Sequence, residues 1–195
     1  MNFRLRLAID KAKAANLPND NIERAIKAGT GAGKDTQTKE VLYEGFGPGG
    51  VAVMVEAITD NSNRTSAEIR NVFTKHGGSM GSHNSVGWMF SLSGVHRLPL
   101  PEKSETKEAL ELACIDAGAT DVREEGDQLV VISAPDKLVD LGRAFGTTNR
   151  SIEADIEYVP TTTVDMADAD RQKLHSLLEI LDDLPDVTRV SSNEN

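Results

Sequence analysis

The sequence predicts an α+β protein, with a partial helical N-terminal domain followed by two ferredoxin-like α+β domains, one inserted in the other. Three observations predict this class. Helical periodicity dominates only residues 1–40, and strand patterns alternate with helix patterns after that point. Residues 93–163 carry the order β-α-β-β-α-β, which is the ferredoxin-like order. A helix and a strand within residues 164–195 then complete the domain that residues 41–92 begin.

Two short amphipathic helices are expected in residues 1–40. The first runs through FRLRLAIDKAKAAN. The second starts at Asp20, with Glu23 three residues later as in a capping box, and stops at Gly29. Because two such helices bury little surface and the chain begins almost inside the first, we expect part of a helical domain to be absent. The polar segment GTGAGKDTQTKE follows as a linker.

The first α+β domain is expected to open with the near-continuous apolar strand VAVMVEAI. Thr65 and Glu68 form a capping-box pattern, so a helix is expected from Thr65 to Gly77. The segment SVGWMFSL follows, and its apolar residues alternate as in a half-buried strand. Those residues are Val86, Trp88, Phe90 and Leu92.

The inserted domain is expected to contain a strand at VHRLPL, a helix at SETKEALELACIDAG and a hairpin made by ATDVREE and DQLVVISA. A second helix at PDKLVDLGRAF and a strand at SIEADIEYVP complete it. After it, the helix DADRQKLHSLLEILDDL turns five leucines inward, and the strand VTRVSS ends the pattern. This last helix and strand would have no domain to pack against unless they complete the first α+β domain.

The charge is unevenly distributed along the chain. The net charge is −10, but residues 1–40 carry +3, residues 41–100 are neutral and residues 101–195 carry −13. The negative net charge of the protein argues against non-specific binding to nucleic acid. The basic N-terminal region still permits one contact in a fixed orientation. The single cysteine, Cys114, suits a reducing compartment, and no apolar run reaches the length of a membrane span. We therefore expect a cytoplasmic protein that does not contact a membrane.

Three short motifs resemble nucleotide-binding or catalytic signatures, but their context favours structural roles. The glycines of YEGFGPGG have dinucleotide-binding spacing, yet a strand follows them where the fingerprint needs a helix. The segment GAGK, residues 31–34, lacks the first glycine and the hydroxyl residue of a phosphate loop. The segment GGSMG, residues 77–81, leaves a helix, whereas a nucleophile elbow enters one.

The remaining polar residues assemble no recognisable catalytic or metal site. The four histidines have no metal-ligand spacing, and one cysteine cannot make a zinc site. The aspartates near the last helix lack the glycine and the final glutamate of a calcium loop. The sequence therefore predicts a protein that is not an enzyme and that uses no cofactor and no metal.

Several of these segments together resemble the YebC family. They are NFRLR with AIDKA, DNIERAI, YEGFGPGG, the DN and NRT pairs of DNSNRT, and the glycine pair at Gly77 and Gly78. The resemblance runs nearly end to end, and it implies a helical first domain with two α+β domains. It also implies either DNA binding at promoters or a ribosome-associated action that eases translation of proline-rich stretches.

Two departures from the family pattern reduce the positive charge. Members of the family open with a basic Gly-His-Ser-Lys-Trp segment and a helix rich in lysine and arginine, which this chain lacks. Their lysine-bearing turn after the aromatic strand is here the uncharged run Ser91-Leu92-Ser93-Gly94.

The candidate nucleic-acid contacts are basic residues on two helical regions. In residues 1–40 they are Arg4, Arg6, Lys11, Lys13, Arg24 and Lys27, and after the DNSNRT turn they are Arg64, Arg70 and Lys75. Any one of them could instead only solvate a helix surface. The candidate functional loop comprises Tyr43, Gly45, Gly47, Pro48, Gly49 and Gly50, for which a structural turn is the alternative.

Three functions remain open on these residues. The first is a DNA-binding regulator of transcription, in which the basic residues contact phosphates. The second is a translation factor that contacts ribosomal RNA on the ribosome. The third is a protein-interaction module that binds no nucleic acid.

Overall fold

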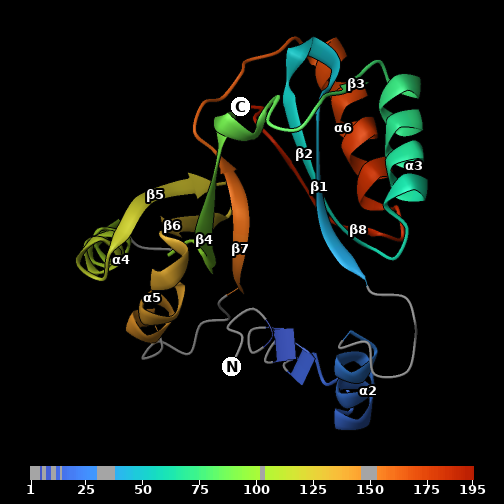
Figure 1. Ribbon diagram of the computed structural model, residues 1–195. Coiled ribbons are helices and arrows are strands. Elements are labelled where there is room, and N and C mark those ends of the chain that lie inside the picture. Colours follow the sequence, from blue (N-terminus) through green and yellow to red (C-terminus); the bar gives the residue numbers. More distant parts are fainter. Residues whose placement is uncertain are drawn as a thin grey trace. The chain divides into compact units, whose positions relative to one another are not determined.

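The structure is a computed structural model that describes residues 5, 8–9, 12–13, 15–29, 38–101, 104–145 and 153–195. It divides into two compact units (Figure 1). Unit 1 comprises residues 1–85 and 166–190, and unit 2 comprises residues 86–165 and 191–195. Among the described residues, no helix combines the length and the apolar character needed to cross a membrane.

The N-terminal part contains helix α2, Asn19–Gly29, in the place expected for the second amphipathic helix. Before it, Asn16 adopts a positive φ of 58°, and the N–H of Leu17 donates to the carbonyl of Ala12. Asparagine tolerates this left-handed conformation, so it ends the preceding helical turn. The expected linker and the GAGK segment fall largely on residues 30–37, which lie outside the described residues.

Unit 1 contains a four-stranded sheet in the order β3-β1-β2-β8. The strands are β1 (Lys39–Phe46), β2 (Ala52–Thr59), β3 (Ser79–Met80) and β8 (Val187–Ser192). Strands β1 and β2 form an antiparallel hairpin in which Tyr43 lies opposite Val55. The 3-10 turn η1, Pro48–Gly50, joins them.

Strand β1 corrects one expectation from the sequence. Residues 39–40 were assigned to a linker and Tyr43 to a turn, but all three lie in an eight-residue strand. Charged residues and Gly45 obscure the alternation there, although Tyr43, Glu44 and Gly45 are all buried. Pairing with β2 stabilises this strand despite its weak intrinsic preference, as is common for β structure.

Two helices pack against each other and against the hairpin of unit 1 (Figure 1). They are α3 (Ser62–Lys75) and α6 (Asp168–Asp182). Ile69 and Phe73 of α3 are fully buried, and so are Leu174, Leu177 and Leu181 of α6. Burying these five large apolar side chains contributes about 1.5–3 kcal/mol each to the stability of this unit.

Helix α3 starts three residues earlier than the capping-box pattern indicated. Asn61 is the N-cap, and its side chain accepts a hydrogen bond from the backbone N–H of Arg64. At the other end Gly77 has a φ of 77°, and the N–H of Gly78 donates to the carbonyl of Phe73 at 2.8 Å. This geometry confirms that the glycines of GGSMG end a helix.

Unit 2 has a four-stranded sheet in the order β5-β6-β4-β7, with helices between the strands. In chain order its elements are β4 (Phe90–Pro99), α4 (Ser104–Asp116), β5 (Ala119–Glu125), β6 (Gln128–Ser133), η3 (Pro135–Lys137), α5 (Leu138–Phe145) and β7 (Glu153–Pro160). This is the expected ferredoxin-like order. Its core lies around Leu98, Cys114, Leu129 and Leu141.

Both units combine helices with a four-stranded sheet, but the strand orders of the two sheets differ. In unit 2 the central strands β6 and β4 are far apart in the chain, whereas in unit 1 the central strands β1 and β2 are consecutive. The strand β1, missed in the sequence, creates this difference. The ferredoxin-like order therefore holds for unit 2 and not for unit 1.

Strand β4 also differs from expectation. Two strands were expected, with a domain boundary between residues 92 and 93, but one continuous strand crosses that position. Before it, residues Gly87–Met89 form the 3-10 turn η2. The turn interrupts the expected alternation, so Val86 and Phe90 are buried while Trp88 is 65% exposed.

Candidate nucleic-acid interface

The outward face of helix α3 brings together small, polar and basic side chains. Ile69, Val72 and Phe73 face the core. On the opposite side a shallow hollow is lined, among the described residues, by Asn63, Ser66, Ala67, Arg70, Asn71 and Thr74. We call these six residues the α3 face. It carries one cation, two amides and two hydroxyls, and it contains no acidic side chain.

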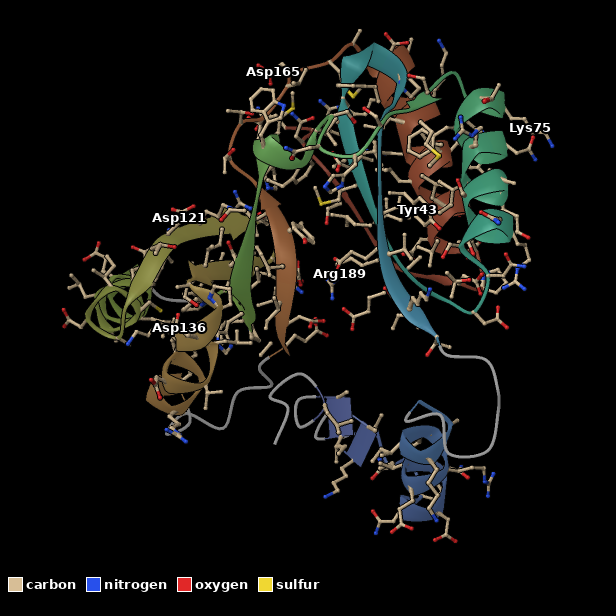
Figure 2. All side chains as sticks on the ribbon, viewed as in Figure 1. Tyr43, Lys75, Asp121, Asp136, Asp165 and Arg189 are labelled. Atoms are coloured by element: carbon tan, nitrogen blue, oxygen red, sulfur yellow. The ribbon has the colours of Figure 1, made fainter. Side chains whose placement is uncertain are left out.

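Lys75 flanks this face at the C-terminal end of α3. Figure 2 shows its side chain pointing away from the sheet. Arg70 and Lys75 are exposed, and neither has an ion pair among the described residues. Ala67 lies between them and the helix start, so the centre of the face permits close approach by a partner surface. The arrangement suits a polyanion that runs along the helix.

A partly buried network fixes the N-terminal turn of α3 and explains the DNSNRT motif. The Thr65 hydroxyl donates to the Asp186 carboxylate at 2.6 Å, and the Thr59 hydroxyl donates to the same oxygen at 3.0 Å. The backbone N–H of Asn61 donates to the Thr59 hydroxyl oxygen at 2.9 Å. The hydrogen bonds from Thr65 and then Arg64 hold the pKa of Asp186 below its usual value.

Arg64 belongs to this network. Its Nη2 lies 3.0 Å from Asp60 Oδ1 and 2.8 Å from Asp186 Oδ2. The hydrogen bond and charge of Asp186 raise the pKa of the guanidinium further. Arg64 was expected to contact nucleic acid, but two carboxylates already engage it, so its visible role is to hold α3 against β8.

Tyr43 supports the same turn from strand β1. Its side chain is buried, and its hydroxyl donates to the backbone carbonyl of Ser62 at 3.2 Å. Burial, and to a lesser extent the charge of Asp186, raises the pKa of Tyr43. Figure 2 shows Tyr43 on the side of β1 that faces α3. This residue of the candidate loop is therefore a positioning residue of the helix.

The glycines of YEGFGPGG serve close packing of the hairpin. A Cβ atom on Gly45 would lie 2.7 Å from the Ser79 carbonyl oxygen and 2.8 Å from the Phe73 ring. A Cβ atom on Gly47 would lie 2.7 Å from Leu174. Only glycine lets β1 approach α3, β3 and α6 this closely.

The turn itself uses the other two glycines and the proline. Gly49 and Gly50 have φ values of 72° and 77°, a conformation that favours glycine, and the Gly47 N–H donates to the Val51 carbonyl at 2.8 Å. Pro48 is buried, whereas Gly49 and Gly50 are exposed. The segment is a hairpin turn with only two exposed residues, Gly49 and Gly50, at its tip. This tip offers little surface for contact with a partner molecule.

The N-terminal cations are only partly visible. Arg4, Arg6 and Lys11 lie outside the described residues. Lys13 and, on helix α2, Arg24 and Lys27 are exposed, as their expected role requires. The structure therefore places Arg64, Arg70 and Lys75 on one helix, and of these Arg64 is engaged by two carboxylates.

The described residues show no metal centre. No group of three or more His, Cys, Asp or Glu side chains in that part of the chain is placed to hold a metal ion. Cys114 is buried, and burial followed by the charge of Glu111 raises the pKa of its thiol to about 11. A thiol with that pKa is a poor nucleophile at neutral pH.

Comparisons with known proteins identify the family. Residues 1–32 match the TACO1/YebC protein N-terminal domain, and residues 38–194 match the TACO1/YebC second and third domain. A protein from Pseudothermotoga lettingae is 42% identical over 192 residues, which cover 98% of this chain and 76% of the relative. One from Carboxydothermus hydrogenoformans is 43% identical over 194 residues, covering 98% and 80%.

Both relatives are described as a probable transcriptional regulatory protein. The crystal structure of a conserved hypothetical protein from Aquifex aeolicus superimposes with a TM-score of 0.89 at 42% identity, and it covers all of this chain and 80% of the other. With both family domains matched along nearly its whole length, the chain belongs to the TACO1/YebC family.

Proposed function

We propose that this protein is a cytoplasmic, non-enzymatic regulator of gene expression that binds nucleic acid through the α3 face. The observation that carries the proposal is that exposed cations on α3 adjoin a hollow whose described lining has no acidic side chain. Six of the described cations pair with a carboxylate, namely Arg64, Arg97, Lys107, Arg123, Arg143 and Lys173. Arg70 and Lys75 have none there, and the hollow beside Arg70 contains no acid.

The side chains of the α3 face are suited to a phosphate backbone. Arg70 can bind a phosphate through two N–H groups, and Lys75 adds a point charge five residues further along the helix. Asn63 and Asn71 offer amide N–H donors, and Thr74 offers a hydroxyl, although that hydroxyl now donates to the Arg70 carbonyl at 2.8 Å. Contacts of this kind position a protein on nucleic acid without reading bases.

DNA is the partner that we propose first. The description of the relatives as probable transcriptional regulatory proteins supports this choice. The net charge of −10 also favours a contact that is limited to the α3 face, because the acidic surface elsewhere on the protein repels phosphate groups. Binding should therefore be weak, strongly salt-dependent and confined to one side of unit 1.

The test is a titration of a labelled DNA duplex at several salt concentrations, with the anisotropy of the label as the readout. Changing Arg70 and Lys75 together to alanine should lower the slope of log affinity against log salt by about 2, since each phosphate contact contributes about 0.9. Ala67→Glu should also weaken binding, because it places a carboxylate in the middle of the face. Lys137→Ala, which removes an exposed cation of unit 2, is the matched control.

Two results would change the proposal. An unchanged salt slope in the Arg70 and Lys75 variant would exclude the α3 face as the binding surface. Binding to purified ribosomes that is at least about tenfold tighter than binding to DNA, a difference of about 1.4 kcal/mol, would replace DNA by ribosomal RNA as the partner.

A further inference from the structure

Trp88 is an exposed aromatic residue that the nucleic-acid proposal does not use. It is the only tryptophan of the chain, and 65% of it is exposed. It lies in turn η2 of unit 2, between the buried residues Val86 and Phe90. Tryptophan is the residue type most enriched at the centres of protein-binding surfaces, so an exposed and isolated one suggests a contact.

Hydrogen bonds to the next residue hold Trp88 in place. The N–H of Met89 donates to the Val86 carbonyl at 2.8 Å. The Met89 carbonyl accepts hydrogen bonds from both the backbone N–H and the hydroxyl of Thr161, at 2.8 and 2.9 Å. Asn193 donates to the Thr162 carbonyl at 3.1 Å, and its amide nitrogen lies 4.0 Å from the Met89 sulfur. The indole is thus presented by a turn with little freedom, which lowers the entropy cost of binding.

Unit 2, which carries this turn, is acidic as a whole. Unit 2 contains seven Lys and Arg residues against 16 Asp and Glu residues, a net charge of −9. Asp165 is exposed, and it belongs to the segment that pairs with residues 193–195 next to the turn. Its carboxylate accepts a hydrogen bond from the Asn195 side chain at 2.7 Å. Figure 2 shows Asp165 beside η2.

We propose that Trp88, which lies on the acidic unit 2 close to the segment that carries Asp165, binds an arginine-rich segment of a partner protein. A guanidinium group stacks on the face of an indole through a cation–π interaction, and neighbouring carboxylates such as Asp165 pair with further arginines. Phosphates would be repelled by the charge of this unit, so the site does not suit nucleic acid. The site is independent of the α3 face, which belongs to unit 1.

Because the chain has one tryptophan, its fluorescence reports directly on this site. The probes are a synthetic peptide of five arginines separated by glycines, the same peptide with lysines, and the same peptide with glutamates. The arginine peptide should change the emission of Trp88 saturably and bind about two to five times more tightly than the lysine peptide. The glutamate peptide should leave the emission unchanged.

Variants measured with a labelled arginine peptide test the role of each group. Trp88→Ala should weaken binding about two- to fivefold and abolish the preference for arginine over lysine, whereas Trp88→Phe should retain part of both. Asp165→Asn should weaken both peptides alike. Leu112→Ala, which removes a side chain of unit 2 that is 63% exposed on α4, is the control and should have no effect.

Equal affinity of Trp88→Ala and the unchanged protein for the arginine peptide would overturn the proposal. So would a single-stranded DNA oligonucleotide that quenches Trp88 when the arginine peptide does not, since that result would assign the indole to base stacking. Neither result depends on the α3 face, because Arg70 and Lys75 can be replaced in the same experiment.

Discussion

Thr65 donates its hydroxyl hydrogen to Asp186 at 2.6 Å, although the two residues are 121 positions apart in the chain. This bond joins the first turn of α3 to the segment between α6 and β8. It lies in the same network as the ion pair between Asp186 and Arg64 at 2.8 Å. The DNSNRT motif therefore fixes the orientation of α3, and with it the positions of the basic residues on this helix.

Replacing Asp186 by asparagine should destabilise the protein by about 1 kcal/mol, because the hydrogen bonds from Thr65 and Arg64 would then end on a neutral amide oxygen and lose their charge assistance. Since the pKa of Asp186 is lower in the folded protein than in the unfolded chain, its contribution is present above about pH 4 and lost as pH falls further. Urea unfolding at neutral and acidic pH measures both effects. Asp121→Asn, on the exposed part of β5, should change the free energy of unfolding by less than about 0.5 kcal/mol.

Gly45→Ala should cost about 1–3 kcal/mol of unfolding free energy, because the new methyl group would press on the Ser79 carbonyl and on the Phe73 ring. Gly29 at the end of α2 has no atom within 4 Å of the corresponding position, so Gly29→Ala should be neutral or slightly stabilising. Thermal unfolding of the two variants compares them directly. Equal melting temperatures would show that the hairpin moves away from α3 without cost.

Lowering the pH should destabilise unit 2 through His96. This residue is buried, its Nε2 lies 2.7 Å from the Leu138 carbonyl oxygen, and its Nδ1 has no hydrogen-bond partner among the described residues. Burial lowers its pKa, although the bond to Leu138 opposes that shift. As the pH falls, His96 is therefore protonated in the unfolded chain before it is protonated in the folded protein. The contribution of His96 to the free energy of unfolding is fully present above about pH 6.5 and decreases as the pH falls below that value.

The comparison is with His96→Gln, which can keep a donor to the Leu138 carbonyl but does not titrate. Between about pH 7.5 and pH 5.5 the unchanged protein should lose about 1 kcal/mol more stability than the variant. The same measurement on His175→Gln, at an exposed position of α6, is the control. If both histidine variants lose stability in parallel with the unchanged protein, His96 does not titrate differently in the two states.

Cys114 should resist modification in the folded protein. It is fully buried, and its thiol has a pKa of about 11, so very little thiolate is present at neutral pH. An aromatic disulfide reagent should react at least about a hundred times more slowly with the folded chain than with the chain in urea. Fast reaction without denaturant would mean that α4 opens readily from the sheet of unit 2.

The mixed α+β class and most of the helices and strands could be predicted because their apolar residues recur with clear periods. The failures have physical causes. Strand β1 contains Glu44, which is buried and accepts the backbone N–H of Asn84 at 2.6 Å, so polar residues occupy places where apolar ones signal a strand. The turn η2 could not be recognised either, because SVGWMFSL alternates as well as a strand does.

The candidate site was only partly predictable from the sequence. The basic residues of α3 were recognised by their type and position, and their exposure agrees with the proposal. The sequence could not show that Arg64 differs from Arg70, since the partner that distinguishes them, Asp186, is 122 positions away. Trp88 was placed in a half-buried strand, and only the three-dimensional turn reveals it as a surface residue.

The division of unit 1 into two chain segments has a consequence for synthesis. Leu174, Leu177 and Leu181 of its core, and the edge strand β8, all come after the main stretch of unit 2. During synthesis, unit 2 can form its sheet before α6 and β8 have been made. Until then, the apolar surfaces of β2 and α3 stay exposed to solvent. Contacts between such distant residues also form slowly. A nascent chain paused before residue 166 would thus be prone to aggregation, and its release would be the step that completes unit 1.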